Sequence, residues 1–135
     1  MKETGYKKLV EKAKEASGKS RSPYSKFVVG SAVLCADGKI YTGTNVENAS
    51  YGLTNCAERS ALFNAVAGGA KEIKAVAVWT KSGGVFPCGA CRQVIIELAP
   101  DAEIAVNKND KDIIIVNIAD LLPFSFSKKN LKKKK

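Results

Sequence analysis

Three cysteines and one glutamate are the residues of this sequence whose types and spacing could do chemistry. Cys56 and Glu58 are separated by one residue, and Cys88 and Cys91 form a C-x-x-C pair directly after Pro87. Thiolates are good zinc ligands, and a neighbouring carboxyl group can transfer protons. The sequence contains no histidine, so it cannot form a Ser-His-Asp or Cys-His nucleophile. The pattern therefore indicates a thiolate metal site beside a proton-transfer group.

The number of ligands distinguishes a catalytic zinc site from a structural one. Three protein ligands leave the fourth tetrahedral position open for water, whereas four close the site. Cys35 ends an apolar segment, and we expect it to be a small buried side chain rather than a fourth ligand. Three thiolates carry excess negative charge, which we expect Arg59 to compensate. A closed four-cysteine zinc module and a metal-free redox C-x-x-C pair remain as alternatives.

The predicted helices and strands place these groups at helix starts, where the backbone N–H groups and the helix dipole favour thiolates. Apolar spacing predicts a helix from Thr4 to Ser17, with Thr4 as its cap and Gly18 at its end. Further helices are predicted over 56–67 and 88–98, a short turn over 119–122, and strands over 27–35, 39–43, 73–80, 102–106 and 112–116. This order predicts an α/β fold with a mixed sheet covered by helices. The polar segment 44–55 is long for a connection, which is typical of functional loops.

Length, composition and charge are those of one globular domain. The chain has 135 residues, of which 45% are hydrophobic and 26% charged, so a disordered or collagen-like class is excluded. Its net charge is +9, but removing the six lysines of the last eight residues leaves 16 basic and 13 acidic residues, a charge of +3 for residues 1–127. We therefore expect a single domain over 1–127 and a lysine-rich, disordered tail over 128–135. Since no membrane span or secretion signal is evident, we expect a cytoplasmic protein that binds neither membranes nor specific nucleic acids.

Taken together, these motifs resemble the three-cysteine zinc site of the small cytidine deaminases. The similarity rests on Cys56–Arg59, Pro87–Gln93, Ser22–Ser25 with Phe27, Asn45–Ala49 with Tyr51, and Leu121–Pro123, and it covers about residues 4–127. It implies a three-layer α/β/α sandwich with a mixed five-stranded sheet, one Zn²⁺ per subunit, and a homotetramer with shared active sites. The implied activity is hydrolytic deamination of cytidine and deoxycytidine, with release of ammonia, in pyrimidine salvage.

The resemblance also implies a role for each residue of the site. Cys56, Cys88 and Cys91 would bind zinc, and Glu58 would carry protons between water, N3 and the departing amine. The implied contacts to the nucleoside are Phe27 packed on the pyrimidine, Asn45 and Glu47 on the ribose hydroxyls, and the backbone of Ala57 on the base. Ala49 and Tyr51 would complete the pocket, partly across a subunit boundary, and Phe126 or the nearby Phe124 would reach a neighbouring site.

Two other substrates are compatible with the same metal motifs. An aminoglycosyl-cytosine antibiotic of the blasticidin type is one, but the amide of Asn45 with the carboxylate of Glu47 suits the vicinal hydroxyls of a nucleoside better. A polynucleotide is the other, and it would need an open, basic and aromatic groove, whereas the excess charge of this chain lies in its tail. A nucleoside is therefore the favoured small-molecule partner.

Overall fold

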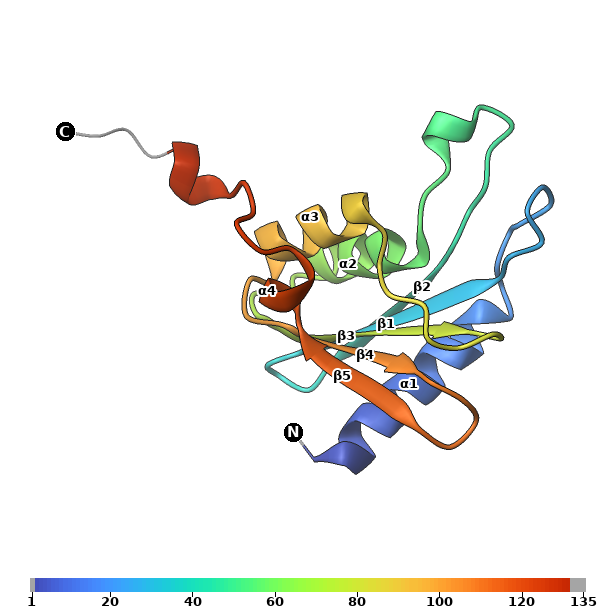
Figure 1. Ribbon diagram of the computed structural model, residues 1–135, viewed down its shortest axis with the longest axis horizontal. Helices are drawn as coiled ribbons and strands as arrows, with labels where there is room; N and C mark the ends of the chain where they lie inside the picture. The colour runs from blue at the N-terminus through green and yellow to red at the C-terminus, as the bar shows by residue number, and fades with distance from the viewer. Residues whose placement is uncertain (1, 132–135) are drawn as a thin grey trace.

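A mixed five-stranded sheet with helices on both faces forms the described part of the chain, residues 2–131, in the computed structural model (Figure 1). The strand order is β2-β1-β3-β4-β5. The strands are β1 (Val29–Cys35), β2 (Ile40–Thr44), β3 (Ile73–Thr80), β4 (Glu103–Asn107) and β5 (Ile113–Asn117). β3 and β4 pair in parallel, and the other neighbouring strands are antiparallel. The predicted α/β/α sandwich and its order of elements are confirmed.

Helix α1 (Glu3–Ser17) covers one face of the sheet by itself (Figure 1). Its buried side chains include Tyr6, Leu9 and Ala13, and they meet a row of alanines on β1, β3 and β4. These small residues let the helix approach closely: a Cβ atom on Gly30 would lie 1.8 Å from the carbonyl oxygen of Ala13. The prediction that Thr4 caps this helix is wrong, because the helix begins one residue earlier and Lys2 occupies the N-cap position.

The opposite face carries α2 (Ala57–Ala67), α3 (Gly89–Leu98) and the short α4 (Ile118–Leu121). The main core lies between these helices and the sheet, and its fully buried side chains include Leu62, Ile95, Ile104, Val76 and Ile118. Because α2 and α3 lie side by side on this face, their N-terminal ends come together (Figure 1). The fold thus brings residues 56–59 and 88–92 to one place.

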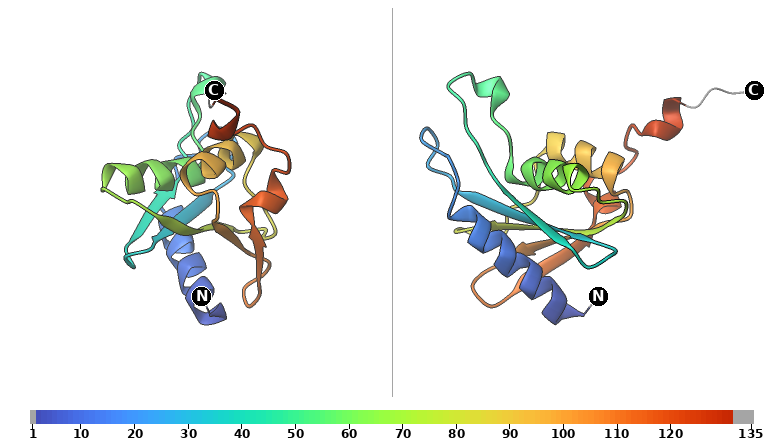
Figure 2. Two further views of the ribbon diagram at one scale, coloured as in Figure 1. Left: turned by 90° about the vertical axis from the view of Figure 1, so that its left-hand side faces the viewer. Right: turned by 180° about the vertical axis from the view of Figure 1, so that it is seen from behind.

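Two long loops project from the body of the domain near one another (Figure 2). One precedes β1, which begins at Val29 rather than at the predicted Phe27, because the Asn45 side chain, not a neighbouring strand, binds the carbonyl oxygen of Phe27 and the N–H of Val29. The other contains the 3₁₀ turn η1 (Tyr51–Leu53). Hydrogen bonds from the Glu47 carboxylate join the two loops.

The C-terminal segment leaves the body of the domain after α4 and ends in a 3₁₀ turn, η2 (Lys128–Leu131) (Figures 1 and 2). Residues 132–135 of the predicted lysine-rich tail lie outside the described residues. Among the residues described, no helix is both long enough and apolar enough to cross a membrane.

A candidate metal and catalytic site

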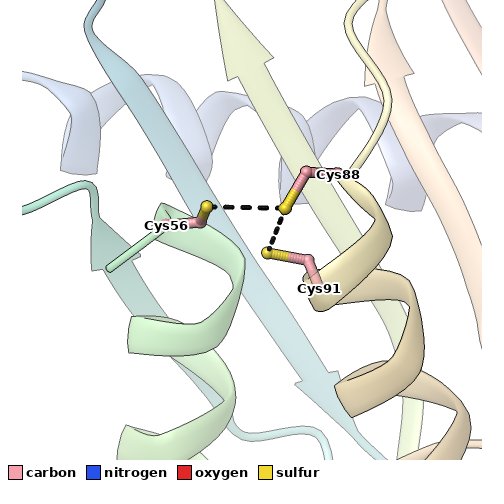
Figure 3. Close-up of side chains that lie close together, drawn as sticks. All are labelled: Cys56, Cys88 and Cys91. Carbon is pink, nitrogen blue, oxygen red and sulfur yellow. Dashed lines mark hydrogen bonds between the residues drawn. The ribbon is translucent and has the colours of Figure 1, made fainter. Parts of the chain in front are cut away.

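Three thiols converge where α2 and α3 begin (Figure 3). Cys56 is the N-cap residue of α2, Cys88 is the N-cap residue of α3, and Cys91 lies in the first turn of α3. The Sγ atom of Cys88 is 3.7 Å from that of Cys56 and 3.5 Å from that of Cys91. All three cysteines are free thiols, so the predicted cluster at two helix starts is present and is not a disulfide.

The donor set and its spacing fit a zinc ion. Zinc binds thiolates at about 2.3 Å in tetrahedral geometry, which places sulfur atoms about 3.8 Å apart. The three Sγ atoms all lie within 4.8 Å of one another. The distances from Cys88 Sγ to Cys56 Sγ, 3.7 Å, and to Cys91 Sγ, 3.5 Å, are close to the separation expected around zinc. Cys35 is not part of the group; it is buried in the main core, as predicted, where burial raises the pKa of its thiol. The cluster therefore offers three ligands rather than four.

Arg59 compensates the negative charge of the thiolates. Its Nη2 atom donates a hydrogen bond to Cys56 Sγ at 3.4 Å. The neighbouring Cys91 thiol and then the Arg59 guanidinium stabilise the Cys56 thiolate and lower the pKa of Cys56 to about 5, whereas the proximity of Cys56 and burial raise the pKa of Cys91. The same contact with Cys56 raises the pKa of Arg59. A thiolate is thus stable at this position at neutral pH.

Glu58 is a buried carboxyl group next to the cluster. Only 4% of its surface is exposed, and it is the second residue of α2. Burial raises its pKa to about 7, and the negative charge of Cys56 adds to this effect. A carboxyl group with a pKa near neutrality can both accept and release a proton at physiological pH, which is what general acid–base catalysis requires.

A cavity of about 270 Å³ opens in front of Glu58, Cys56 and Cys88. Phe27 lines its mouth, with 45% of its side chain exposed, and the predicted residues Asn45, Glu47 and Ala57 also line it. Ser25 of the Ser22–Ser25 motif and Thr54 and Asn55 of the polar loop also line it. The wall is completed by residues that the sequence did not single out, namely Val29, Val78, Val85 and Phe86. Among these, Phe86 could have been found, because it directly precedes the Pro87–Cys91 motif.

Asn45 and Glu47 have structural contacts within the cavity wall. The buried Asn45 amide accepts the N–H of Val29 at 3.0 Å and donates to the carbonyl oxygen of Phe27 at 2.7 Å. Oε1 of Glu47 accepts the N–H groups of Tyr24 at 2.9 Å and Ser25 at 3.1 Å, and the Ser25 hydroxyl also donates to the carboxylate and lowers its pKa. Both side chains therefore hold the loop that carries Phe27.

The remaining predicted contacts lie outside this cavity. Ala49 is exposed, and Tyr51 is 77% exposed, with its ring packed edge-on against Tyr24 at a centroid distance of 6.2 Å. Phe126 is 61% exposed on the C-terminal segment, and neighbouring Phe124 is fully exposed. Within residues 2–131 of one chain, these side chains do not meet the residues that surround Glu58.

Comparisons with known proteins agree with this geometry. Residues 3–107 match the sequence profile described as the cytidine and deoxycytidylate deaminase zinc-binding region. The chain is 48% identical to the cytidine deaminase of Sporosarcina psychrophila, with 92% of this chain and 93% of that protein covered, and 44% identical to that of Halalkalibacterium halodurans, with 91% and 95% covered. It superposes on the crystal structure of the cytidine deaminase from Burkholderia pseudomallei with a TM-score of 0.85 and 47% identity, over 93% of this chain and all of that one.

Proposed function

Since the chain belongs to the cytidine and deoxycytidylate deaminase family, a family of hydrolytic deaminases, we propose that it converts cytidine and deoxycytidine to uridine and deoxyuridine with release of ammonia. The observation that carries this proposal is a cluster of three thiols beside the buried Glu58, which lines a cavity of about 270 Å³ together with Cys56 and Cys88. Salvage of pyrimidine nucleosides in the cytoplasm is the physiological setting we propose for this reaction.

Cys56, Cys88 and Cys91 would hold one zinc ion per subunit. When bound, zinc supplies Lewis-acid catalysis, which makes water acidic enough to lose a proton near neutral pH. Arg59 offsets the charge of the thiolates through its hydrogen bond to Cys56, and the N-terminal ends of α2 and α3 add their partial positive charges.

Glu58 would move the protons of the reaction. In hydrolytic deamination, water adds its oxygen to C4 of the pyrimidine and the amino group leaves as ammonia. The Glu58 carboxylate would accept the first proton that water loses and deliver it to N3. It would then take the second proton, from the new hydroxyl on C4, and pass it to the departing nitrogen, so that ammonia leaves as the C4 carbonyl forms. Its pKa of about 7 suits this sequence, because the group gains and loses a proton at little cost near neutral pH.

The cavity wall would orient the nucleoside. Phe27 offers a ring face for the pyrimidine, and the backbone of Ala57 lies next to Glu58, where the edge of the base must sit. Asn45 and Glu47 would bind the ribose hydroxyls with the hydrogen-bonding capacity that their loop contacts leave free, since an amide nitrogen has two hydrogens and a carboxylate has several lone pairs.

A homotetramer would bring the remaining residues to the site. Ala49, Tyr51 and Phe126 are exposed and lie outside the cavity of their own chain. We propose that they complete the cavity of a neighbouring subunit, which would also cover aromatic side chains that water contacts in the single chain.

The test is deamination of cytidine, deoxycytidine, free cytosine and blasticidin S by zinc-loaded protein, followed by ultraviolet absorbance. Turnover of both nucleosides but not of the free base is expected. Glu58→Gln is the matched variant, and it should lose at least about 100-fold in kcat while keeping its zinc, because only the proton transfer is removed. Turnover of the antibiotic alone, or full activity of zinc-loaded Glu58→Gln, would contradict the proposal.

A further inference from the structure

Arg92 directly follows Cys91, and its side chain bridges two segments that are distant in the sequence. Nε donates a hydrogen bond to the carbonyl oxygen of Pro87 at 2.7 Å, and Nη1 donates to the carbonyl oxygen of Leu121 at 2.8 Å. Pro87 lies immediately before the N-cap residue of α3, and Leu121 is the last residue of α4. One guanidinium therefore joins the start of the thiol-bearing helix to the end of another.

The helix geometry explains why Arg92 can make both contacts. Side chains on an α-helix tilt toward its N-terminus, so Arg92 reaches back past the first turn of α3. The Pro87 carbonyl precedes the helix, and the Leu121 carbonyl is among the last of α4, so neither has a partner within its own helix. The cationic guanidinium satisfies both acceptors with charge-assisted hydrogen bonds, which are stronger than neutral ones.

The contact with Pro87 bears on the direction of the Cys88 thiol. The peptide group that joins Pro87 to Cys88 is planar, so fixing its carbonyl oxygen also fixes the plane from which the Cys88 side chain departs. Pro87 itself is fully buried. Cys88 is the exposed member of the thiol group, whereas Cys91 is buried and Cys56 is half-buried, so packing holds Cys88 less than the other two.

The far end of the bridge is packed against the main core. Ile118 of α4 is completely buried in the main core, and Leu121 and Leu122 pack against that core. A second hydrogen bond connects α3 to the C-terminal segment: Gln93 Nε2 donates to the carbonyl oxygen of Phe126 at 2.8 Å. Two consecutive residues after Cys91 thus hold the segment from Leu121 to Phe126.

We propose that Arg92 is a positioning residue for the metal centre, which fixes the Cys88 thiol by holding the Pro87 carbonyl against the end of α4. Through this bridge, the placement of the C-terminal segment and the affinity of the thiols for metal are coupled. The inference rests on the proposed function only in that the three thiols bind zinc. A lysine cannot replace Arg92, because a single Nζ lacks the two separated donors of the planar guanidinium.

The test measures zinc affinity by competition with a chromophoric chelator in Arg92→Lys, Arg92→Gln and the wild type. The matched control is Lys71→Gln, which removes one positive charge from an exposed lysine beyond the C-terminal end of α2, whereas Cys56 caps the N-terminal end of that helix. We expect both Arg92 variants to lose about 10–100-fold in zinc affinity, and the control to lose none. We also expect faster amide hydrogen exchange over residues 118–126 in both variants and a weaker thiolate charge-transfer band when cobalt replaces zinc.

Arg92→Lys keeps the positive charge and most of the aliphatic side chain. A loss of zinc affinity in this variant would therefore reflect the lost hydrogen-bond bridge rather than a lost charge or gross misfolding. Zinc affinity within about twofold of the wild type in Arg92→Lys would overturn the inference, as would an equal loss in Lys71→Gln. A wild-type protein that binds no zinc would overturn both this inference and the proposed function. Weakened zinc binding in the variants of a protein that deaminates no nucleoside would support the inference and contradict only the proposed function.

Discussion

At the scale of single residues, the electrostatic environment of the site depends on a few groups at two helix starts. Burial raises the pKa of Glu58 to about 7, while the neighbouring Cys91 thiol and the Arg59 guanidinium lower the pKa of Cys56 to about 5. Two acidic groups two residues apart therefore have pKa values displaced in opposite directions. This division suits a carboxyl that exchanges protons beside a thiolate that must remain a ligand.

Replacing Arg59 tests the compensation of the thiolate charge. Arg59→Gln removes the donor to Cys56 Sγ, so we expect zinc affinity to fall about 10–100-fold and the pKa of Cys56 in the metal-free protein to rise. Chelator competition measures the first effect, and the pH dependence of thiolate absorbance measures the second. Unchanged zinc affinity together with unchanged activity would show that Arg59 is not needed for this role.

At the scale of elements, close packing of glycine and alanine sets how the helices sit on the sheet. A Cβ atom on Gly43 of β2 would lie 2.3 Å from the backbone nitrogen of Ala61 and 2.8 Å from the carbonyl oxygen of Ala57. Helix α2 therefore rests directly on β2, and the position of Cys56 at its start depends on that contact. The buried Tyr6 fixes α1 to β4 in a different way, through a hydrogen bond from its hydroxyl to the Glu103 carboxylate.

Gly43→Ala should displace α2 and destabilise the fold by about 1–3 kcal/mol, because backbone atoms rather than flexible side chains stand in the way. The measurement is urea unfolding of the metal-free protein, followed by zinc titration. Gly52→Ala is the matched control, since its new Cβ meets nothing within 4 Å, and it should change stability by less than about 0.5 kcal/mol. Equal stability of the two variants would contradict this packing argument.

Tyr6→Phe should change how stability depends on alkaline pH. Burial, and then the hydrogen bond and charge of Glu103, raise the pKa of Tyr6 to about 12, above the value of about 10 for an unfolded tyrosine. The contribution of Tyr6 is therefore complete below about pH 10 and is lost as pH rises toward 12. We expect the variant to be about 1 kcal/mol less stable at pH 9 and the difference to shrink by pH 12. Urea midpoints that run parallel over this range would contradict the assignment.

At the scale of the whole molecule, the single chain leaves large apolar side chains in water. Phe63 and Val66 are about half exposed on α2, and Phe124, Phe126 and Leu131 are exposed on the C-terminal segment that leaves the domain (Figure 1). Large apolar side chains that are exposed in a single chain can be covered by protein–protein contacts. This exposure supports the proposed homotetramer, whose neighbouring chains would cover these residues.

A mixed assembly tests whether active sites are shared. Phe126→Ala should lower kcat/KM about tenfold if its ring contacts substrate in a neighbouring site, and Glu58→Gln should be nearly inactive. When the two variants are unfolded and refolded together, some sites would combine an intact Glu58 with an intact Phe126 from the next chain. Activity above the average of the two parents is expected, in particles four times the mass of the 14.4 kDa chain. Activity equal to that average, or a monomeric mass, would contradict sharing.

The sequence by itself determined the chemistry and the elements. A thiolate metal site with a proton-transferring carboxyl group is predicted from Cys56, Glu58, Cys88 and Cys91, because residue types determine what a site can bind and transfer. Apolar spacing predicted every main helix and strand within a few residues, since that spacing reflects burial on one face. The errors concern the cap of α1 and the start of β1. Both lie at the ends of elements, where local hydrogen bonds to the backbone determine the boundary.

Only the tertiary structure decided how these parts meet. Cys56 and Cys88 are 32 positions apart, and they come within 3.7 Å because α2 and α3 share one face of the sheet. The loop contacts of Asn45 and Glu47, the Arg92 bridge to Leu121 and the separation of Tyr51 and Phe126 from the cavity have no signal in local sequence. They depend on distances between segments that the strand order brings together, and spacing along the chain does not encode such distances.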